Sequence, residues 1–353
     1  MQTQTSLANR NLSLDLLRVL ACLLVIWQHV TESYYIAADG SFTAAAYAST
    51  IAWIDSLSRA SVPLFIMLSG YFLLPMRDDS ASVFLKKRAS RVLFPFLFWC
   101  VVYAAVRSGS LAAFLTHIAC IPVNWGVEVG HLWYVYMILG LYALIPAISP
   151  WVRNCGKGEM RAYLLLWGVT TLLPYVHLLW SEVLGECYWN PTPMLYHFTG
   201  LSGFLVLGTY VRKFGAPSRL ASAVLLIVGY AATAIVFCKR AECVTSAIDV
   251  ELSWNFCTPN VAMMTLGLFG LVSSVKLNPS SRVSLAIAKA SAISYSVYLA
   301  HILVLHRVHS AIAPHVASVG LAIPLIAVTT FLLTLAAMAI CSKLPKSHCW
   351  LGT

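Results

Sequence analysis

Long apolar segments separated by short polar breaks run along the whole chain. A helix that crosses a bilayer needs about 20 mostly apolar residues, and ten segments approach that length. The pattern predicts an all-α membrane protein with about ten transmembrane helices in a single bundle, one domain over residues 1–353 and no soluble appended domain. The predicted spans are residues 14–36, 51–74, 92–107, 131–151, 162–180, 195–211, 220–238, 257–275, 290–312 and 320–342.

The composition supports a membrane location. Hydrophobic residues make up 59% of the chain and charged residues 10%, against roughly 25% charged residues in a soluble domain. The mean hydropathy is +0.79. The formal net charge of +10 does not require nucleic acid as a partner, because most basic residues fall in the loops on one predicted side of the membrane.

The basic residues also predict an orientation. With the N-terminus in the cytoplasm and the spans alternating in direction, all but five of the 23 Lys and Arg residues fall on the inner side. Basic residues accumulate in the cytoplasmic loops of membrane proteins. We therefore expect a multi-pass membrane protein with both termini cytoplasmic. The exceptions are Arg59, Arg107, Lys239, Arg240 and Arg307.

The ten cysteines do not predict a metal site, because they form no C-x-x-C pair and no zinc-binding spacing. Several lie in apolar spans, where a cysteine usually behaves as a small hydrophobic residue. Four border the predicted outer face, so the sequence is compatible with one disulfide there. These four are Cys120, Cys187, Cys243 and Cys257.

The first predicted span carries two ionisable side chains, Arg18 and His29, eleven residues apart. On an α-helix this spacing brings them within about 20° of one face and roughly 16 Å apart along the axis. Ionisable groups inside a membrane are costly and normally face a protein interior or a wet cavity. Asp15 lies one turn before Arg18 and can pair with it. A functional cavity is therefore expected beside this helix.

A run of basic residues precedes the third predicted span and contains Lys86, Lys87, Arg88 and Arg91. Arg88 and Arg91 are three residues apart and share a face if the segment is helical. Guanidinium groups hold phosphate oxygens through paired, charge-assisted hydrogen bonds. Taken alone, the run fits better with a cluster that only enforces the membrane topology, so both interpretations stay open.

Two further segments, residues 131–136 and 295–301, place polar and aromatic side chains at membrane depth. Each residue alone is more typical of a hydrogen-bonded packing position than of a catalyst. Several predicted helices together nevertheless contribute polar groups that need partners inside the membrane, which indicates a shared site. The candidate substrate-binding residues are His131, Trp133, Tyr134, Tyr298 and His301.

These motifs, in this order, resemble those of the acyltransferase 3 family of integral-membrane acyltransferases over essentially the whole chain. They are Leu14 to Arg18 followed by His29, Val62 to Leu74, Arg88 with Arg91, His131 to Tyr136, and Tyr295 to His301. The resemblance implies a ten-helix enzyme that moves an acyl group, commonly acetyl from acetyl-CoA, to a hydroxyl of a cell-envelope sugar or polysaccharide. Its implied partners are acyl-CoA, an envelope glycan or lipid-linked sugar, and the lipid bilayer.

The resemblance also assigns a catalytic set. By position, Arg18 and His29 match the Arg and His of the family's first helix. A sugar hydroxyl needs a base as it attacks a thioester, and a neutral imidazole suits that task. His29 is therefore the expected general base, and Arg18 and Asp15 complete the expected catalytic residues.

The expected donor-binding residues are Arg88, Arg91, Lys86 and Lys87, of which the two arginines match the family's R-x-x-R pair. No G-x-S-x-G motif is present, and the sequence does not distinguish direct transfer from a covalent acyl-enzyme or identify an oxyanion donor. A transporter or flippase of a lipid-linked glycan is the alternative function. It would share the buried His and Arg residues but would need no CoA site.

Overall fold

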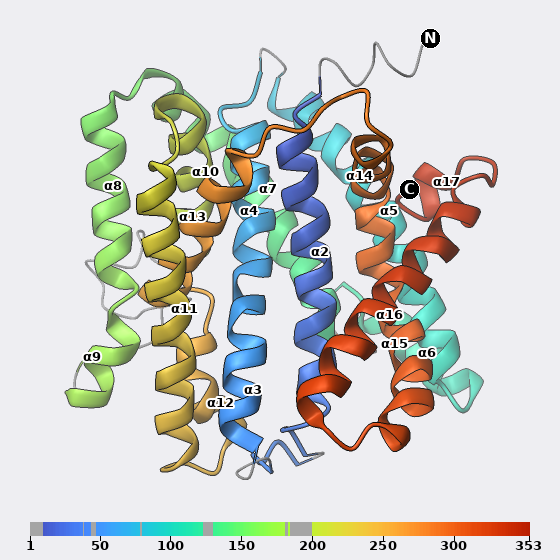
Figure 1. The fold of residues 1–353 in the computed structure, drawn as a ribbon. Coiled ribbons are helices and arrows are strands. Elements are labelled where there is room, and N and C mark those ends of the chain that lie inside the picture. Colours follow the sequence, from blue (N-terminus) through green and yellow to red (C-terminus); the bar gives the residue numbers. More distant parts are fainter. Residues whose placement is uncertain are drawn as a thin grey trace.

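The computed structural model describes residues 10–37, 39–43, 47–77, 80–122, 130–180, 183 and 200–353. Within these residues the chain is almost entirely helical and forms no strand beyond two isolated bridges. The helices run roughly side by side in one bundle (Figure 1). The prediction of an all-α membrane bundle is confirmed.

The bounds of the helices are as follows. They are α2 (Leu12–Glu32), α3 (Ala48–Asp55), η2 (Ser56–Ala60), α4 (Ser61–Leu73), α5 (Ala81–Arg107), α6 (Leu111–Cys120), η3 (Gly130–Leu132), α7 (Trp133–Asn154), α8 (Lys157–Thr170), α9 (Leu173–Leu179), α10 (Ser202–Phe214), α11 (Arg219–Ala241), α12 (Ala247–Val250), η5 (Glu251–Trp254), α13 (Pro259–Ser273), α14 (Arg282–Ala292), α15 (Ser294–Ile312), η6 (Ala313–His315), α16 (Val319–Cys341) and α17 (Ser347–Trp350).

Among the described residues, seven helices are long and apolar enough to cross a membrane, and two bent helix pairs raise the number to as many as nine. The sequence predicted ten spans. The difference lies in the sixth predicted span, residues 195–211. Helix α10 supplies only 13 residues there, from Ser202 to Phe214, and residues 195–199 lie outside the described part of the chain.

Helix α2 lies at the centre of the bundle and packs against α4, α14, α15 and α16 (Figure 1). Helices α4 and α10 approach each other most closely where Gly70 and Gly208 face the neighbouring backbone. A Cβ atom added at Gly70 would lie 1.9 Å from the carbonyl oxygen of Leu205, and one added at Gly208 would lie 2.0 Å from that of Met67. Small residues of this kind let membrane helices pack backbone to backbone.

The ninth predicted span, residues 290–312, is divided by a sharp bend. Helices α14 and α15 meet at 74° around Ile293. Two serines flank this bend, and the Ser294 hydroxyl donates to the carbonyl oxygen of Ser291 at 2.9 Å. Such local side-chain bonds compete with the helical ladder, so the apolar pattern alone did not reveal the break. The bend places the start of α15 beside α2 and α5.

The basic run before the third predicted span belongs to a helix and not to a loop. Helix α5 begins at Ala81, where Ser80 caps it by accepting from the backbone N–H of Val83, whereas the prediction started at residue 92. Lys and Arg are good helix formers, and a search for apolar residues alone begins the helix too late. Arg88 and Arg91 therefore share one face of a helix, as their interpretation as a phosphate-binding pair requires.

Three of the four cysteines near the predicted outer face, Cys120, Cys243 and Cys257, are free thiols. The fourth, Cys187, lies outside the described residues.

Candidate active site

A cavity of about 590 Å³ lies toward the end of the bundle where α2 begins. This end is the upper one in Figure 1. Arg18 from α2 and both Arg88 and Arg91 from α5 line the cavity. The sequence assigned these arginines to separate roles, but the structure brings them to one wall. Lys86 and Lys87 are exposed on the same helix and do not line the cavity.

Arg18 is held in place by its neighbours at the bend between α14 and α15. Its guanidinium donates to the Ser291 hydroxyl at 3.1 Å and lies 3.6 Å from the Asp15 carboxylate. Ser291 in turn donates to Asp15 at 2.7 Å, and Arg10 also pairs with this carboxylate. Asp15 therefore anchors Arg18. It lies about 21 Å along the helix axis from His29. Asp15 therefore positions Arg18 at the cavity and is too far away to act on His29 directly.

Three histidines from distant parts of the chain meet deeper in the bundle. The ring centroid of His29 in α2 lies 5.4 Å from that of His301 in α15 and 6.1 Å from that of His131 in η3. His131 and His301 are 4.9 Å apart and are 3% and 0% exposed. In the described part of the chain, no group of three or more His, Cys, Asp or Glu residues is arranged to hold a metal ion.

The partners of His29 and His301 fix which ring nitrogen carries the proton in each. Nδ1 of His29 lies 2.9 Å from Oε2 of Glu32, and Nδ1 of His301 lies 2.5 Å from the carbonyl oxygen of Tyr298. Both partner oxygens accept, so both Nδ1 atoms donate. The neutral rings then present Nε2 as a proton acceptor, and Nε2 of the buried His301 has no partner.

Glu32 was not among the residues predicted from the sequence. Its signal was a carboxylate one helical turn after His29, a spacing that places both side chains on one face. A carboxylate that accepts from Nδ1 orients the imidazole and stabilises its protonated form. Glu32 thus belongs with the histidines as the residue that positions His29.

Tyr298 joins the histidine cluster to the cavity. Its side chain lines the cavity, its hydroxyl donates to the carbonyl oxygen of His131, and its own carbonyl binds His301. Tyr134 also lines the cavity, with its ring centroid 5.4 Å from that of Tyr298. Trp133 points elsewhere and stacks on Phe256 at 5.9 Å. Of the predicted substrate-binding residues, the two tyrosines therefore reach the cavity wall.

The Acyltransferase domain family matches residues 11–343 of the chain. The chain belongs to this acyltransferase family. The resemblance found in the sequence motifs is thereby confirmed at the level of the family. Searches of curated proteins and of solved structures gave no match.

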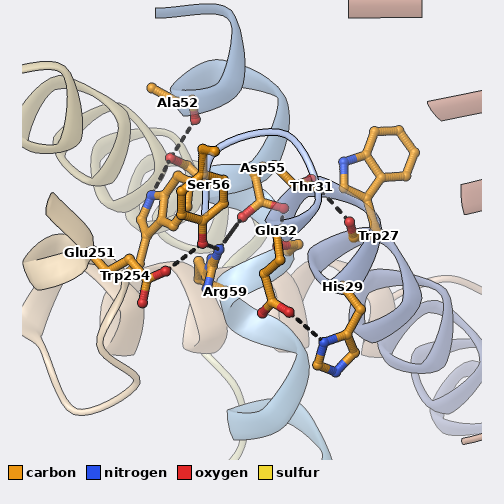
Figure 2. A network of polar contacts seen from close by, with 12 residues as sticks. Trp27, His29, Thr31, Glu32, Ala52, Asp55, Ser56, Arg59, Glu251 and Trp254 are labelled. Carbon is orange, nitrogen blue, oxygen red and sulfur yellow. Dashed lines mark hydrogen bonds and ion pairs between the residues drawn. The ribbon is translucent and has the colours of Figure 1, made fainter. Parts of the chain in front are cut away.

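The acyltransferase also buries a network of ionisable side chains next to Glu32 (Figure 2). Arg59 of η2 pairs with Asp55 of α3, with Nη2 2.6 Å from Oδ2, and stacks 3.9 Å above the ring of Trp254. Arg59 also donates to the Tyr35 hydroxyl at 3.3 Å. The Tyr35 hydroxyl donates to Glu251 at 2.5 Å.

This network contains more carboxylates than cations. Asp55, Glu32 and Glu251 all interact electrostatically with the single guanidinium of Arg59, and Asp55 and Arg59 are 0% and 3% exposed. In Figure 2 Asp55, Arg59 and Glu251 lie on the side of Glu32 away from His29.

Arg59 stood out in the sequence only as an exception to the orientation rule. The available signal was its spacing from Asp55. Two opposite charges four residues apart inside an apolar segment share a helical face, and such a pair inside a membrane is a candidate functional or structural element.

Proposed function

We propose that this acyltransferase is an O-acetyltransferase that moves an acetyl group from acetyl-CoA to a hydroxyl of a cell-envelope sugar or polysaccharide, with His29 as the general base. The observation that carries the proposal is the contact between Nδ1 of His29 and the Glu32 carboxylate. This contact leaves Nε2 of His29 as a proton acceptor beside the buried histidines.

Chemistry favours His29 over His301 as the base. Both imidazoles have Nδ1 bound, but His29 faces a carboxylate whereas His301 faces a neutral carbonyl oxygen. A carboxylate stabilises the imidazolium that forms when the base takes a proton, because opposite charges attract strongly in a medium of low polarity. The carboxylate partner therefore makes His29 the proposed base.

The transfer itself is direct in this proposal. Nε2 of His29 takes the proton of the sugar hydroxyl as its oxygen attacks the thioester carbonyl carbon. The tetrahedral adduct then collapses, the carbon–sulfur bond breaks, and the CoA thiolate leaves. The His29 imidazolium returns its proton to the thiolate. The products are the sugar acetate ester and CoA, and the base is regenerated neutral.

Donor binding is assigned to the cavity. Arg18, Arg88 and Arg91 line a space of about 590 Å³, and planar guanidinium groups suit phosphate oxygens. The acyl arm of CoA would extend past Tyr298 toward His301 and His29. The exposed Lys86 and Lys87 attract the anionic donor to the mouth of the cavity over a longer range.

The acceptor is assigned from the motif resemblance. Within the family, the motif set is most like that of the inner-membrane O-acetyltransferase of enterobacterial common antigen, which suggests an envelope glycan or a lipid-linked sugar as acceptor. In this proposal the chain is a multi-pass protein of the inner membrane with both termini cytoplasmic. The donor then enters from the cytoplasmic end, and His131, Trp133 and His301 lie on the acceptor side of Tyr298.

A test uses the purified protein in lipid nanodiscs with acetyl-CoA carrying an isotopically labelled acetyl group. Mass spectrometry should find labelled ester on glycan extracted from the envelope. His29→Gln should still bind acetyl-CoA but lose turnover by on the order of 100- to 10,000-fold. His315→Gln, at an exposed histidine of η6, is the matched control.

A folded His29→Gln protein that binds acetyl-CoA and retains more than about a tenth of the turnover would exclude His29 as the base. His301 would then be the next residue to test. A wild-type protein that neither binds acetyl-CoA nor releases CoA, but moves a lipid-linked glycan across the bilayer, would favour a flippase.

A further inference from the structure

The wall of the arginine cavity includes residues from the end of the chain. His348, Gly352 and Thr353 line it together with Arg18, Arg88 and Arg91. The family match ends at residue 343, so these three residues belong to this chain's own tail and not to the matched domain. We define the tail as residues 347–353.

The tail is packed firmly against α5. Leu351 is 4% exposed, and its carbonyl oxygen accepts from the indole N–H of Trp99 at 3.4 Å. The ring of Trp350 packs edge-on against Phe98 with centroids 5.1 Å apart. In Figure 1 α17 lies beside α5 at the same end of the bundle as the start of α2. The tail therefore holds a defined position at the cavity.

Gly352 lets the tail lie directly on the cavity wall. Its φ angle is +79°, and a Cβ atom there would lie 2.8 Å from Cδ1 of Tyr295, so a side chain would be both strained and blocked. The Tyr295 hydroxyl donates to the carbonyl oxygen of Val92 at 2.9 Å. Val92 follows Arg91 on α5, and both it and Tyr295 line the cavity. The tail thus covers the part of the wall next to Arg91.

The charges around the cavity favour an anion. Three arginines and one histidine line it, against the terminal carboxylate of Thr353 and no Asp or Glu side chain in its described lining. His348 is exposed at this wall. An imidazole carries at least one N–H donor in either protonation state, so it can donate to a phosphate oxygen beside the guanidinium groups.

We propose that the tail forms part of the donor site and that His348 binds a phosphate of the acyl-CoA donor. This inference rests on the proposed function, because it takes acyl-CoA as the donor. The tail would set the affinity for the nucleotide end of the donor, and it would leave the chemistry at His29 unchanged because that residue lies deeper in the bundle.

The test compares His348→Ala with Cys349→Ala, whose exposed side chain lies next to it on α17 and does not line the cavity. Both proteins are purified in nanodiscs and assayed with acetyl-CoA and with S-acetylpantetheine, which lacks the nucleotide and its phosphates. His348→Ala should raise the Kd and the KM for acetyl-CoA about five- to tenfold, with kcat at saturating donor unchanged. Both variants should match the wild type with S-acetylpantetheine.

Two results would overturn the inference while the proposed function stands. The first is that His348→Ala binds acetyl-CoA as tightly as Cys349→Ala does, although Arg88→Gln binds it more weakly than the wild type. The other is an equal loss with both donors, which would show that His348 does not act on the phosphates. A wild-type protein that does not bind acetyl-CoA would overturn both this inference and the proposed function. Removal of residues 347–353 adds a second check, since it should weaken acetyl-CoA binding at least as much as His348→Ala.

Discussion

Glu32 accepts a hydrogen bond from His29 one turn earlier on α2, with Oε2 2.9 Å from Nδ1. Because both residues belong to one helix, its geometry places their side chains on one face. A carboxylate on one ring nitrogen fixes the opposite nitrogen as the proton acceptor. The pair therefore combines orientation of the imidazole with stabilisation of its charged form.

Glu32→Gln tests this pair. The amide oxygen can still accept from Nδ1, but the negative charge that stabilises the imidazolium is gone. We expect kcat to fall by on the order of 100-fold while the Kd for acetyl-CoA stays within about twofold. Glu242→Gln, at an exposed glutamate beyond α11, is the control. Wild-type turnover in Glu32→Gln would show that the carboxylate does not contribute to catalysis.

The second prediction concerns the stability of the Asp55–Arg59 pair. Both side chains are buried, so removing one partner leaves an uncompensated charge, which typically costs about 3–5 kcal/mol. We expect Arg59→Leu and Asp55→Leu each to lower the thermal unfolding temperature in detergent markedly. The double variant should recover part of the loss, because neither member of the Asp55–Arg59 pair then remains without the other.

The exposed pair Lys239–Glu242, with side chains 73% and 61% exposed, is the matched control. Its removal should change the free energy of unfolding by less than about 1 kcal/mol. Equal effects of the two pairs on unfolding would mean that the buried pair is not a structural element of the bundle.

The third prediction separates donor binding from membrane topology in the basic run. Replacing Arg88 and Arg91 together by Lys keeps the charge but removes the planar fork. We expect acetyl-CoA binding to weaken by about tenfold or more. Replacing Lys86 and Lys87 together by Gln removes two charges from the same helix outside the cavity. That change should leave the Kd within about threefold at physiological salt.

Both double variants should insert in the membrane with the wild-type orientation. If the double Lys variant binds and transfers normally, the arginines serve topology alone, as the sequence by itself suggested. Isothermal titration of acetyl-CoA into nanodisc-embedded protein measures the difference directly.

The sequence identified individual residues of the site better than it identified the contacts between them. Helical periodicity correctly described relations within one helix, such as Arg88 with Arg91. It could not show that His301, on a helix about 270 residues farther along the chain, stacks on His29, because no local pattern encodes the packing of α15 on α2. The bend at Ile293, which brings Ser291 to Arg18, lies inside an apolar run and was also hidden.

Other misses had local signals that were not used. Glu32 and the Asp55–Arg59 pair lie at helical spacings that single out charged partners within apolar segments. The tail carried no signal of this kind. Its contribution to the cavity depends on a close approach of Gly352 to Tyr295, which only the assembled structure reveals.

The last prediction tests the orientation with two natural thiols. Cys243 and Cys349 are free and exposed, and they lie at opposite ends of the bundle, beyond α11 and within α17 (Figure 1). If both termini are cytoplasmic, a membrane-impermeant maleimide added to spheroplasts should label a variant that retains only Cys243. It should label a variant that retains only Cys349 after the membrane is permeabilised, and not before. The reverse pattern would place the arginine cavity on the outer side. Cytoplasmic acetyl-CoA could not reach it there, so the same measurement bears on the choice of donor.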